Sequence, residues 1–320
     1  MPTSAALSLE FPQTLLQPGC APLPHWGVIQ AQGEEAAHFL HNQLTQDVLL
    51  LPVGQSRLAA FCSAKGRMQA SFIVIKTAPD TVLLVMSQDL LPQTLKRLTM
   101  FVMRAKVKLT DASALWQLRG LCGDSVQALL GDASPWQSVT QDRVHAVALY
   151  PAKVGDRSLA RALWLAPADH ALPHAAEIST ALWQWTEVMS GVSLLSQAVF
   201  EAFVPQMLNY ESVGGVNFKK GCYPGQEVVA RSQFRGTLKR RTALVHSTVA
   251  LSAGQEVFTP SDPEQACGTV VTSAPHPEGH GFDALVSGTL ESMAEGWHLG
   301  TASGSELTFL PLPYPLLEDI

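Results

Sequence analysis

A cysteine with basic neighbours is the residue in this chain best placed to do chemistry by itself. Cys222 follows Lys219 and Lys220, and the Pro224-Gly225 pair after it is typical of the start of a helix, which we expect to run to about residue 234. Two preceding lysines and the positive end of a helix both favour the thiolate form of a cysteine. The sequence therefore predicts a reactive thiol. A buried cysteine that only packs is the alternative, and it is less consistent with a polar turn.

Basic residues are concentrated around this cysteine, since seven of the 21 lysines and arginines fall within 23 positions. They are Lys219, Lys220, Arg231, Arg235, Lys239, Arg240 and Arg241. In a chain with a net charge of -6, such a cluster indicates a specific anionic ligand, for example a carboxylate tail, a phosphate or a short stretch of RNA. Arg231 and Arg235 are four residues apart on one helix face, where they can clamp a carboxylate. A solvated helix face followed by a linker is the alternative.

Two tryptophans are candidates for the wall of a ligand site. Trp26 precedes a strand-like apolar pair, and Trp183 lies in a helical pattern before Gly191. Flat aromatic side chains can hold a fused-ring cofactor, although the core is the simpler explanation for each. The ten histidines and five cysteines show no spacing typical of a metal site, and no phosphate-binding glycine loop occurs. We therefore expect no bound metal and no nucleotide chemistry.

Composition limits the class of protein. The 320 residues are 47% hydrophobic and 15% charged, which excludes a disordered chain and predicts a large core. The net charge argues against a surface coated for nucleic acid, and no apolar run is long enough to span a membrane. The odd number of widely spaced cysteines excludes a disulfide framework, and no Lys or Arg precedes Arg57, as a targeting peptide would require. We expect a cytoplasmic protein with no membrane partner.

Alternating helix and strand patterns must position these side chains. We expect helices over 33–44, 88–105, 124–130 and 172–190, besides the helix that begins near residue 224. Strands are expected over 57–62, 68–76, 81–86, 106–110, 116–121 and 144–149, and Gly66 supplies a positive φ in the turn between the first two. From residue 241 short β-prone runs, separated by Gly, Pro and Ser, predict a small β-barrel or sandwich. We place the boundary between the two parts near residue 240.

The stretch Lys-Gly-Cys-Tyr-Pro-Gly-Gln-Glu at 220–227, followed by Arg231 and by Phe-Arg-Gly at 234–236, resembles the signature of the YgfZ family. These proteins are folate-binding relatives of aminomethyltransferase, the T-protein of glycine cleavage (GcvT). The similarity extends over nearly the whole chain, and includes Trp26, the stretch 42–48, the turn 64–66, Trp183 and the closing stretch 311–315. It implies an α+β protein with the GcvT-like fold. Two interleaved α+β subdomains within residues 1–240 would surround a folate cavity, and residues 241–320 would form a C-terminal β-barrel.

The resemblance also implies a ligand and a cellular function. A tetrahydrofolate-type cofactor is expected, together with a role in assembling or repairing iron–sulfur clusters that in turn affects tRNA modification and in which Cys222 matters. The residues expected at the cofactor are Trp26, Trp183, Lys220, Tyr223, Gln226, Glu227, Arg231 and Arg235. Expected partners are folate and iron–sulfur client or assembly proteins, with at most an indirect or weak link to tRNA.

Two departures from aminomethyltransferase bear on catalysis. Where the T-protein has paired aspartates, this chain has Ala70-Ser71, and the Arg-x-x-x-Gly-x-Pro signature has become 187–193, without its Arg and Pro. Because carboxylates at that point handle protons and charge, aminomethyl transfer by the T-protein route is not expected. A one-carbon transferase or demethylase stays an alternative if another carboxylate, Asp47 or Glu227, reaches the cavity. A direct tRNA-binding module that uses the basic cluster is a further alternative.

Overall fold

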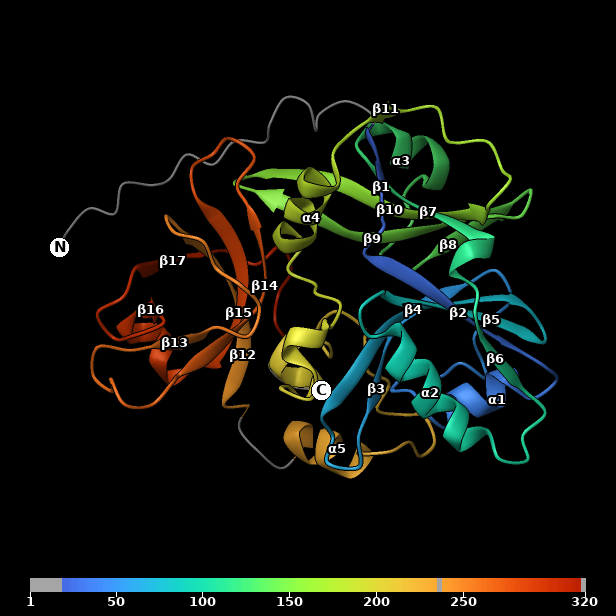
Figure 1. The fold of residues 1–320 in the computed structure, drawn as a ribbon, viewed down its shortest axis with the longest axis horizontal. Coiled ribbons are helices and arrows are strands. Elements are labelled where there is room, and N and C mark those ends of the chain that lie inside the picture. Colours follow the sequence, from blue (N-terminus) through green and yellow to red (C-terminus); the bar gives the residue numbers. More distant parts are fainter. Residues whose placement is uncertain (1–18, 235–237, 318–320) are drawn as a thin grey trace.

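Two β-sheets and a closed β-barrel make up the fold in the computed structural model, which describes residues 19–234 and 238–317 (Figure 1). The five-stranded sheet consists, in spatial order, of β3 (Ser56–Cys62), β4 (Met68–Ala78), β5 (Thr81–Ser87), β2 (Trp26–Gln32) and β6 (Lys108–Asp111). The six-stranded sheet consists of β11 (Ala176–Glu177), β1 (Gly19–Pro22), β7 (Trp116–Cys122), β10 (Arg157–Pro167), β9 (Val144–Val154) and β8 (Ser138–Gln141). The barrel consists of β12 (Arg240–Ser247), β15 (Phe282–Thr289), β14 (Gly268–Pro275), β13 (Glu256–Phe258), β16 (Trp297–Leu299) and β17 (Glu306–Leu310).

The two sheets are interleaved in the sequence. After β1 the chain builds the whole five-stranded sheet, and only then returns with β7, which pairs antiparallel with β1 from Gly19 opposite Cys122. One hydrophobic core extends across both sheets, and barrel residues such as Leu244 and Leu285 belong to it. This arrangement confirms the predicted α+β fold with interleaved parts, and it resolves the C-terminal alternatives in favour of a barrel. The division near residue 240 stays a prediction.

Five α-helices and four short 3-10 helices within the described residues connect the strands. The α-helices are α1 (Ala36–His41), α2 (Leu91–Val102), α3 (Asp124–Leu130), α4 (Thr180–Met189) and α5 (Gln226–Phe234). The 3-10 helices are η2 (Ser113–Leu115), η3 (Gln197–Val199), η4 (Pro205–Leu208) and η5 (Glu291–Glu295). The ranges of α3 and α5 agree with the sequence prediction. None of these helices is long and apolar enough to cross a membrane.

The helix predicted over 172–190 is wrong in its first part. β11 lies there instead, paired parallel with β1, and the N–H of Ile178 donates to the carbonyl of Cys20 at 3.0 Å. Ser179 is extended, with ψ 150°, and its hydroxyl accepts a hydrogen bond from the N–H of Leu182 at 3.1 Å, which caps α4. The sequence also missed β10, which pairs with β7 and β9 on its two sides. The first error arises where pairing with a distant strand outweighs local preference, whereas β10 forms a hairpin with the preceding strand β9.

The turn between β3 and β4 holds α5 in place. Gly66 has a φ of +72°, as the sequence predicts, and a Cβ at this position would lie 2.9 Å from the Cβ of Val228 on α5. On the other side of the same contact, a Cβ on Gly225 would lie 2.3 Å from the carbonyl oxygen of Ser63. Only glycine allows two backbones to approach this closely with positive φ. The start of α5 is therefore fixed against the five-stranded sheet.

Buried polar contacts fasten the barrel to the rest of the molecule. Arg241 on β12 forms an ion pair with Glu211, and the side chains are 6% and 0% exposed. The indole N–H of Trp185 on α4 donates to Asp283 on β15 at 2.6 Å. A buried charge must be paired to be tolerated. These contacts therefore fix the position of the barrel against the rest of the molecule.

Candidate functional site

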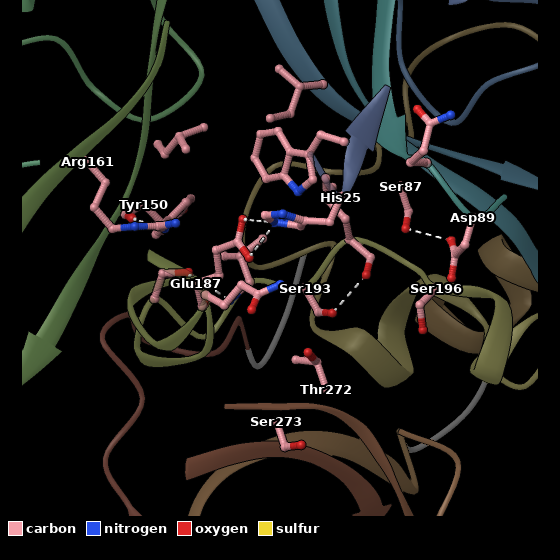
Figure 2. A pocket seen from close by; sticks show the side chains of 18 of the residues that line it. His25, Ser87, Asp89, Tyr150, Arg161, Glu187, Ser193, Ser196, Thr272 and Ser273 are labelled. Carbon is pink, nitrogen blue, oxygen red and sulfur yellow. Dashed lines mark hydrogen bonds and ion pairs between the residues drawn. The ribbon is translucent and has the colours of Figure 1, made fainter. Parts of the chain in front are cut away.

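A cavity of about 520 Å³ lies where the two sheets and the barrel meet. Small-molecule sites in proteins have volumes of about 300–1,000 Å³, so this cavity can enclose a cofactor. Its walls come from the start of β2, the end of β5, the facing strands β9 and β10, helix α4, the segment 192–196 and the barrel strand β14. In Figure 2 the labelled side chains of these elements surround one space, with Thr272 and Ser273 on the barrel side.

A histidine and a glutamate meet in this cavity. Nε2 of His25 lies 3.2 Å from Oε2 of Glu187, and Figure 2 shows the two side chains pointing toward each other. The indole N–H of Trp183 donates to Oε1 of Glu187 at 2.8 Å. Glu187 is thus held from two sides, while Nδ1 of His25 is buried without a hydrogen-bond partner among the described residues.

Arg161 provides a buried cation next to this pair. Its Nε donates to the hydroxyl of Thr186 at 2.8 Å, and its guanidinium lies 4.4 Å from the centre of the Trp183 ring. Burial lowers the pKa of Arg161 to about 10, although the nearby carboxylate of Glu187 opposes this shift. Arg161 therefore stays charged at neutral pH, and the cavity wall contains both a cation and an anion.

The two predicted tryptophans occupy different places. Trp26 lines the cavity. Trp183 is fully buried behind the wall, where a Cβ on Gly120 would lie only 2.4 Å from its ring, and it reaches the cavity through its hydrogen bond to Glu187. The structure therefore makes Trp26 a wall residue and Trp183 a positioning residue within the core.

The carboxylates of the cavity are not those that the sequence suggested. Glu187 and Asp89 line it, whereas neither Asp47 nor Glu227 does. Asp47 is bound instead to His41, with Oδ1 3.1 Å from Nδ1. At the position of the missing aspartates, the hydroxyl of Ser71 is buried and accepts a hydrogen bond from the N–H of Leu195 at 2.6 Å.

The segment 220–227 lies at the start of α5 and does not line this cavity. Lys220 is buried, and its Nζ donates to the carbonyl oxygens of His41 and Leu44, the latter at 2.8 Å. Burial lowers the pKa of Lys220 to about 8, against the opposing effects of Asp47 and Cys222. The ammonium group also lies 4.8 Å from the ring centre of Tyr223, whose pKa is raised by burial. Lys220 and Tyr223 therefore join the segment to the rest of the fold.

The remaining predicted residues of this segment are more accessible. Cys222 is exposed, and Gln226 is half-buried. Glu227 and Arg231 form an exposed ion pair of 2.7 Å, one helical turn apart. Arg235 lies outside the described residues. Whether these side chains contact a cofactor stays a prediction.

The basic cluster does not form one surface in the described residues. Lys220 and Arg241 are buried and bound to internal partners, and Arg240 donates to the carbonyl oxygen of Cys267 at 3.1 Å. Lys219 and Lys239 are exposed. A run of charges in the sequence is thus divided between the interior and the surface, because the chain turns from α5 into the barrel here.

Comparison with known proteins places the chain in a family. Residues 8–162 match the family described as the GCVT N-terminal domain. A "tRNA-modifying protein YgfZ" of Vibrio atlanticus (strain LGP32) is 31% identical over 227 residues, which cover 70% of this chain and 68% of that protein. The chain belongs to the YgfZ family. A "tRNA-modifying protein YgfZ" of Photorhabdus laumondii is 27% identical over 328 residues and covers 98% of this chain and 95% of its own length.

A solved structure supports the fold expected for a YgfZ-family protein. Aminomethyltransferase T of the glycine cleavage system from Bartonella henselae matches with a TM-score of 0.66 and 15% identity, over 96% of this chain and 88% of that one. The GcvT-like fold predicted from the sequence is thereby confirmed.

Sequence reasoning missed His25, Arg161 and Tyr150 in the cavity of this YgfZ-family protein. His25 directly precedes Trp26, and Arg161 is the single charge within an apolar stretch, a pattern that often marks a paired buried residue. Glu187 lies one helical turn after Trp183, so the two must share a face of α4. These signals are local, whereas the contact of His25 with Glu187 joins residues 162 positions apart.

Proposed function

We propose that this YgfZ-family protein binds a tetrahydrofolate-type cofactor in the central cavity and acts as an accessory protein in iron–sulfur cluster assembly or repair, and thereby in tRNA modification. We place it in the cytoplasm. The observation that carries the folate part is the pairing of Glu187 with a half-satisfied His25 beside the indole of Trp26.

The residues present fit a reduced pterin and its acidic tail. The carboxylate of Glu187 can accept hydrogen bonds from the N–H groups of the ring, and His25 holds this carboxylate in the cavity wall. Trp26 offers a flat apolar surface, and Arg161 is a cation in the same wall. When bound, tetrahydrofolate carries one-carbon units on its nitrogen atoms. In this protein Trp183 would keep Glu187 oriented toward it.

Calorimetric titration of tetrahydrofolate under anaerobic conditions tests the cofactor. Glu187→Gln removes a charged acceptor, so we expect binding at least about tenfold weaker, which corresponds to about 1.4 kcal/mol. Trp26→Ala should weaken binding to a similar degree. Glu264→Gln, in an exposed barrel loop, is the matched control and should bind like the wild type. Wild-type affinity in Glu187→Gln and Trp26→Ala, or no binding by the wild type, would contradict the folate assignment.

Cells that lack the protein test the second half of the proposal. The activity of iron–sulfur enzymes and the level of thiolated tRNA should fall in such cells and be restored by the wild type but not by Cys222→Ser. Because Cys222 is exposed, its replacement should leave folate binding and stability unchanged. Full restoration by Cys222→Ser would separate the thiol from the function.

A folate-dependent one-carbon transferase or demethylase is the second candidate. The observation that favours it is that two carboxylates, Glu187 and Asp89, line the cavity despite the loss of the T-protein aspartates. Formation of methylene-tetrahydrofolate from an aminomethyl donor, with release of ammonia, that is abolished in Glu187→Gln or Asp89→Asn would support this activity. If the wild type forms no product at saturating folate, the transferase is excluded and the accessory function is the remaining candidate.

A further inference from the structure

A second cavity, of about 440 Å³, lies between helix α2, strands β3 and β4 and the segment that follows η3. Among the described residues, its lining has no residue in common with that of the central cavity. Its volume falls within the range of about 300–1,000 Å³ that is usual for small-molecule sites. This second cavity can therefore hold a ligand of its own, whether or not folate is bound.

A buried glutamine holds two charged side chains in the wall of the second cavity. Gln69 on β4 is 4% exposed, and its Oε1 accepts a hydrogen bond from Nε of Arg97 on α2 at 2.9 Å. Its Nε2 donates to Oε1 of Glu201 at 2.6 Å, and the N–H of Glu201 donates in turn to the carbonyl of Met68 at 3.0 Å. Arg97 and Glu201 therefore have defined positions before any ligand binds.

The charge around the second cavity favours an anion. Lys96 and Arg97 line it together with one carboxylate, that of Glu201. Nη1 and Nη2 of Arg97 form no hydrogen bond or ion pair within the part of the chain that the structure describes, so the planar end of the guanidinium is available. This group presents two parallel N–H donors, which match the two oxygens of a carboxylate. A carboxylate is therefore the anion that the wall fits.

Apolar side chains form the rest of this wall. Phe61 is buried, Phe200 is half-buried and Met100 is exposed, and all three line the second cavity. The ring of Phe61 is held edge-on by Phe101, with the ring centres 6.4 Å apart and an angle of 77° between the planes. Rings arranged in this way pack against the flat face of another aromatic group. The wall therefore fits an anion that also has an aromatic body.

A buried hydroxyl group without a partner is the independent observation that points to a ligand. Thr94 lines the second cavity and is 3% exposed, yet its Oγ1 has no hydrogen-bond partner among the described residues. A threonine in a helix can bond to the carbonyl four residues earlier, as Thr99 on the same helix does to Leu95 at 2.7 Å. Thr94 does not, and a buried hydroxyl left unpaired costs free energy. A ligand in the cavity supplies the partner that the protein lacks.

We propose that the second cavity is a binding site for a small aromatic carboxylate. The ring packs against Phe61 and Phe200, and the carboxylate binds the free end of the Arg97 guanidinium. The hydroxyl of Thr94, one helical turn before Arg97 on the same face of α2, donates to a ligand oxygen. Binding is non-covalent and goes beyond the proposed function, because it involves neither the folate site nor Cys222.

Calorimetric titration of 1-naphthoate into the full-length protein tests the site, with 1-naphthamide as an uncharged probe of the same shape. The wild type should bind 1-naphthoate at least about tenfold more tightly than 1-naphthamide, and Arg97→Met should lose this preference. Arg104→Met is the matched control, since it removes an exposed arginine that follows α2 and lies outside the cavity lining. Equal affinity of the wild type for the two probes, or no binding of 1-naphthoate at millimolar concentration, would overturn the proposal.

The hydroxyl of Thr94 provides a test that separates binding from folding. Thr94→Val keeps the shape of the side chain and removes an unpaired polar group, so its midpoint in urea unfolding should equal or exceed that of the wild type. Its affinity for 1-naphthoate should nevertheless fall about tenfold. Thr99→Val, whose hydroxyl is bound within α2, is the control and should bind 1-naphthoate like the wild type. Wild-type affinity in Thr94→Val would contradict the assigned role of the hydroxyl and overturn the site.

Competition distinguishes the second cavity from the central one. Saturating tetrahydrofolate, and the replacement Trp26→Ala, should both leave the affinity for 1-naphthoate unchanged. Displacement of 1-naphthoate by tetrahydrofolate, with loss of its binding in Trp26→Ala, would place the probe in the central cavity and overturn the proposal. Failure of the wild type to bind tetrahydrofolate, with 1-naphthoate still bound, would contradict the proposed function and support the separate site.

Discussion

The side chain of Lys220 binds the C-terminal end of α1. Carbonyl groups in the last turn of a helix lack partners within the helix, and the ammonium group satisfies that of His41. It also satisfies the carbonyl group of Leu44, which lies beyond the end of α1. A lysine buried in this way loses hydration, which explains why its pKa falls to about 8 from an ordinary value of 10.5. Lys220 therefore stabilises the loop that presents Cys222, and is engaged before any ligand arrives.

The lowered pKa of Lys220 predicts a specific dependence of stability on pH. Between pH 8 and 10.5 the unfolded chain keeps a proton on this lysine that the folded protein has released, so this residue's contribution to the free energy of unfolding rises with pH. In Lys220→Met this contribution is absent. Urea unfolding at pH 7.5 and pH 9.5 should show the wild type gaining stability relative to the variant as pH rises. A difference that does not change with pH would show that Lys220 titrates normally in the folded state.

At the level of single residues, the sequence singles out the thiol but not the residues of the cavity. Cys222 could be named because the argument for it depends on neighbours in the chain, and the structure places it at the surface. Its reactivity stays a prediction. Glu187 and His25 could not be paired from the sequence, because only the fold brings α4 to the start of β2. Trp183 could be named as a candidate from the sequence, but its position behind Glu187 could not be predicted.

The contact between the β3–β4 turn and α5 can be tested at the level of these elements. Gly66→Ala imposes a positive φ on alanine and pushes a methyl group into Val228, so we expect a loss of about 2 kcal/mol or more in the free energy of unfolding. Gly155→Ala is the matched control, since φ there is +56° and nothing lies within 4 Å of the new Cβ. It should cost only the conformational part, about 1 kcal/mol.

A second replacement separates the two causes of this loss. In the background of Gly66→Ala, Val228→Ala removes the side chain that the new methyl group meets, so part of the stability should return in urea unfolding. If Gly66→Ala costs no more than Gly155→Ala, then α5 does not pack tightly on the turn. The turn and the start of α5 were both predictable from the sequence, because the positive φ of Gly66 and the beginning of the helix follow from local turn chemistry.

Elements that depend on distant pairing were predicted less well. α3 and the hairpin of β3 and β4 follow from periodicity and turn residues, and both agree with the structure. β11 and β13 are only two and three residues long, so they have no periodicity to detect and exist because a neighbouring strand offers free backbone groups. Sequence therefore predicted the class of fold and the barrel, but not the full strand set of either sheet.

At the scale of the whole molecule, the ion pair of Arg241 and Glu211 determines how firmly the barrel is attached. Arg241→Met leaves the carboxylate of Glu211 buried without its cation, so we expect a loss of about 3–5 kcal/mol in urea unfolding. The double variant with Glu211→Gln should recover much of this loss, since no uncompensated charge is left. Lys106→Met, which breaks an exposed pair with Glu34, is the control and should cost at most about 1 kcal/mol. Equal losses in the two single variants would contradict this view of the interface.

The interleaved order of the two sheets has a consequence for folding during synthesis on the ribosome. As the chain leaves the ribosome, β1 emerges first, but its partners β7 and β11 follow only after residues 23–115 have been made. Meanwhile β2 to β6 are contiguous and can close their own sheet. β1 is therefore an unpaired strand with both edges open during this interval, the condition in which a nascent chain is most exposed to wrong pairing and most dependent on chaperones.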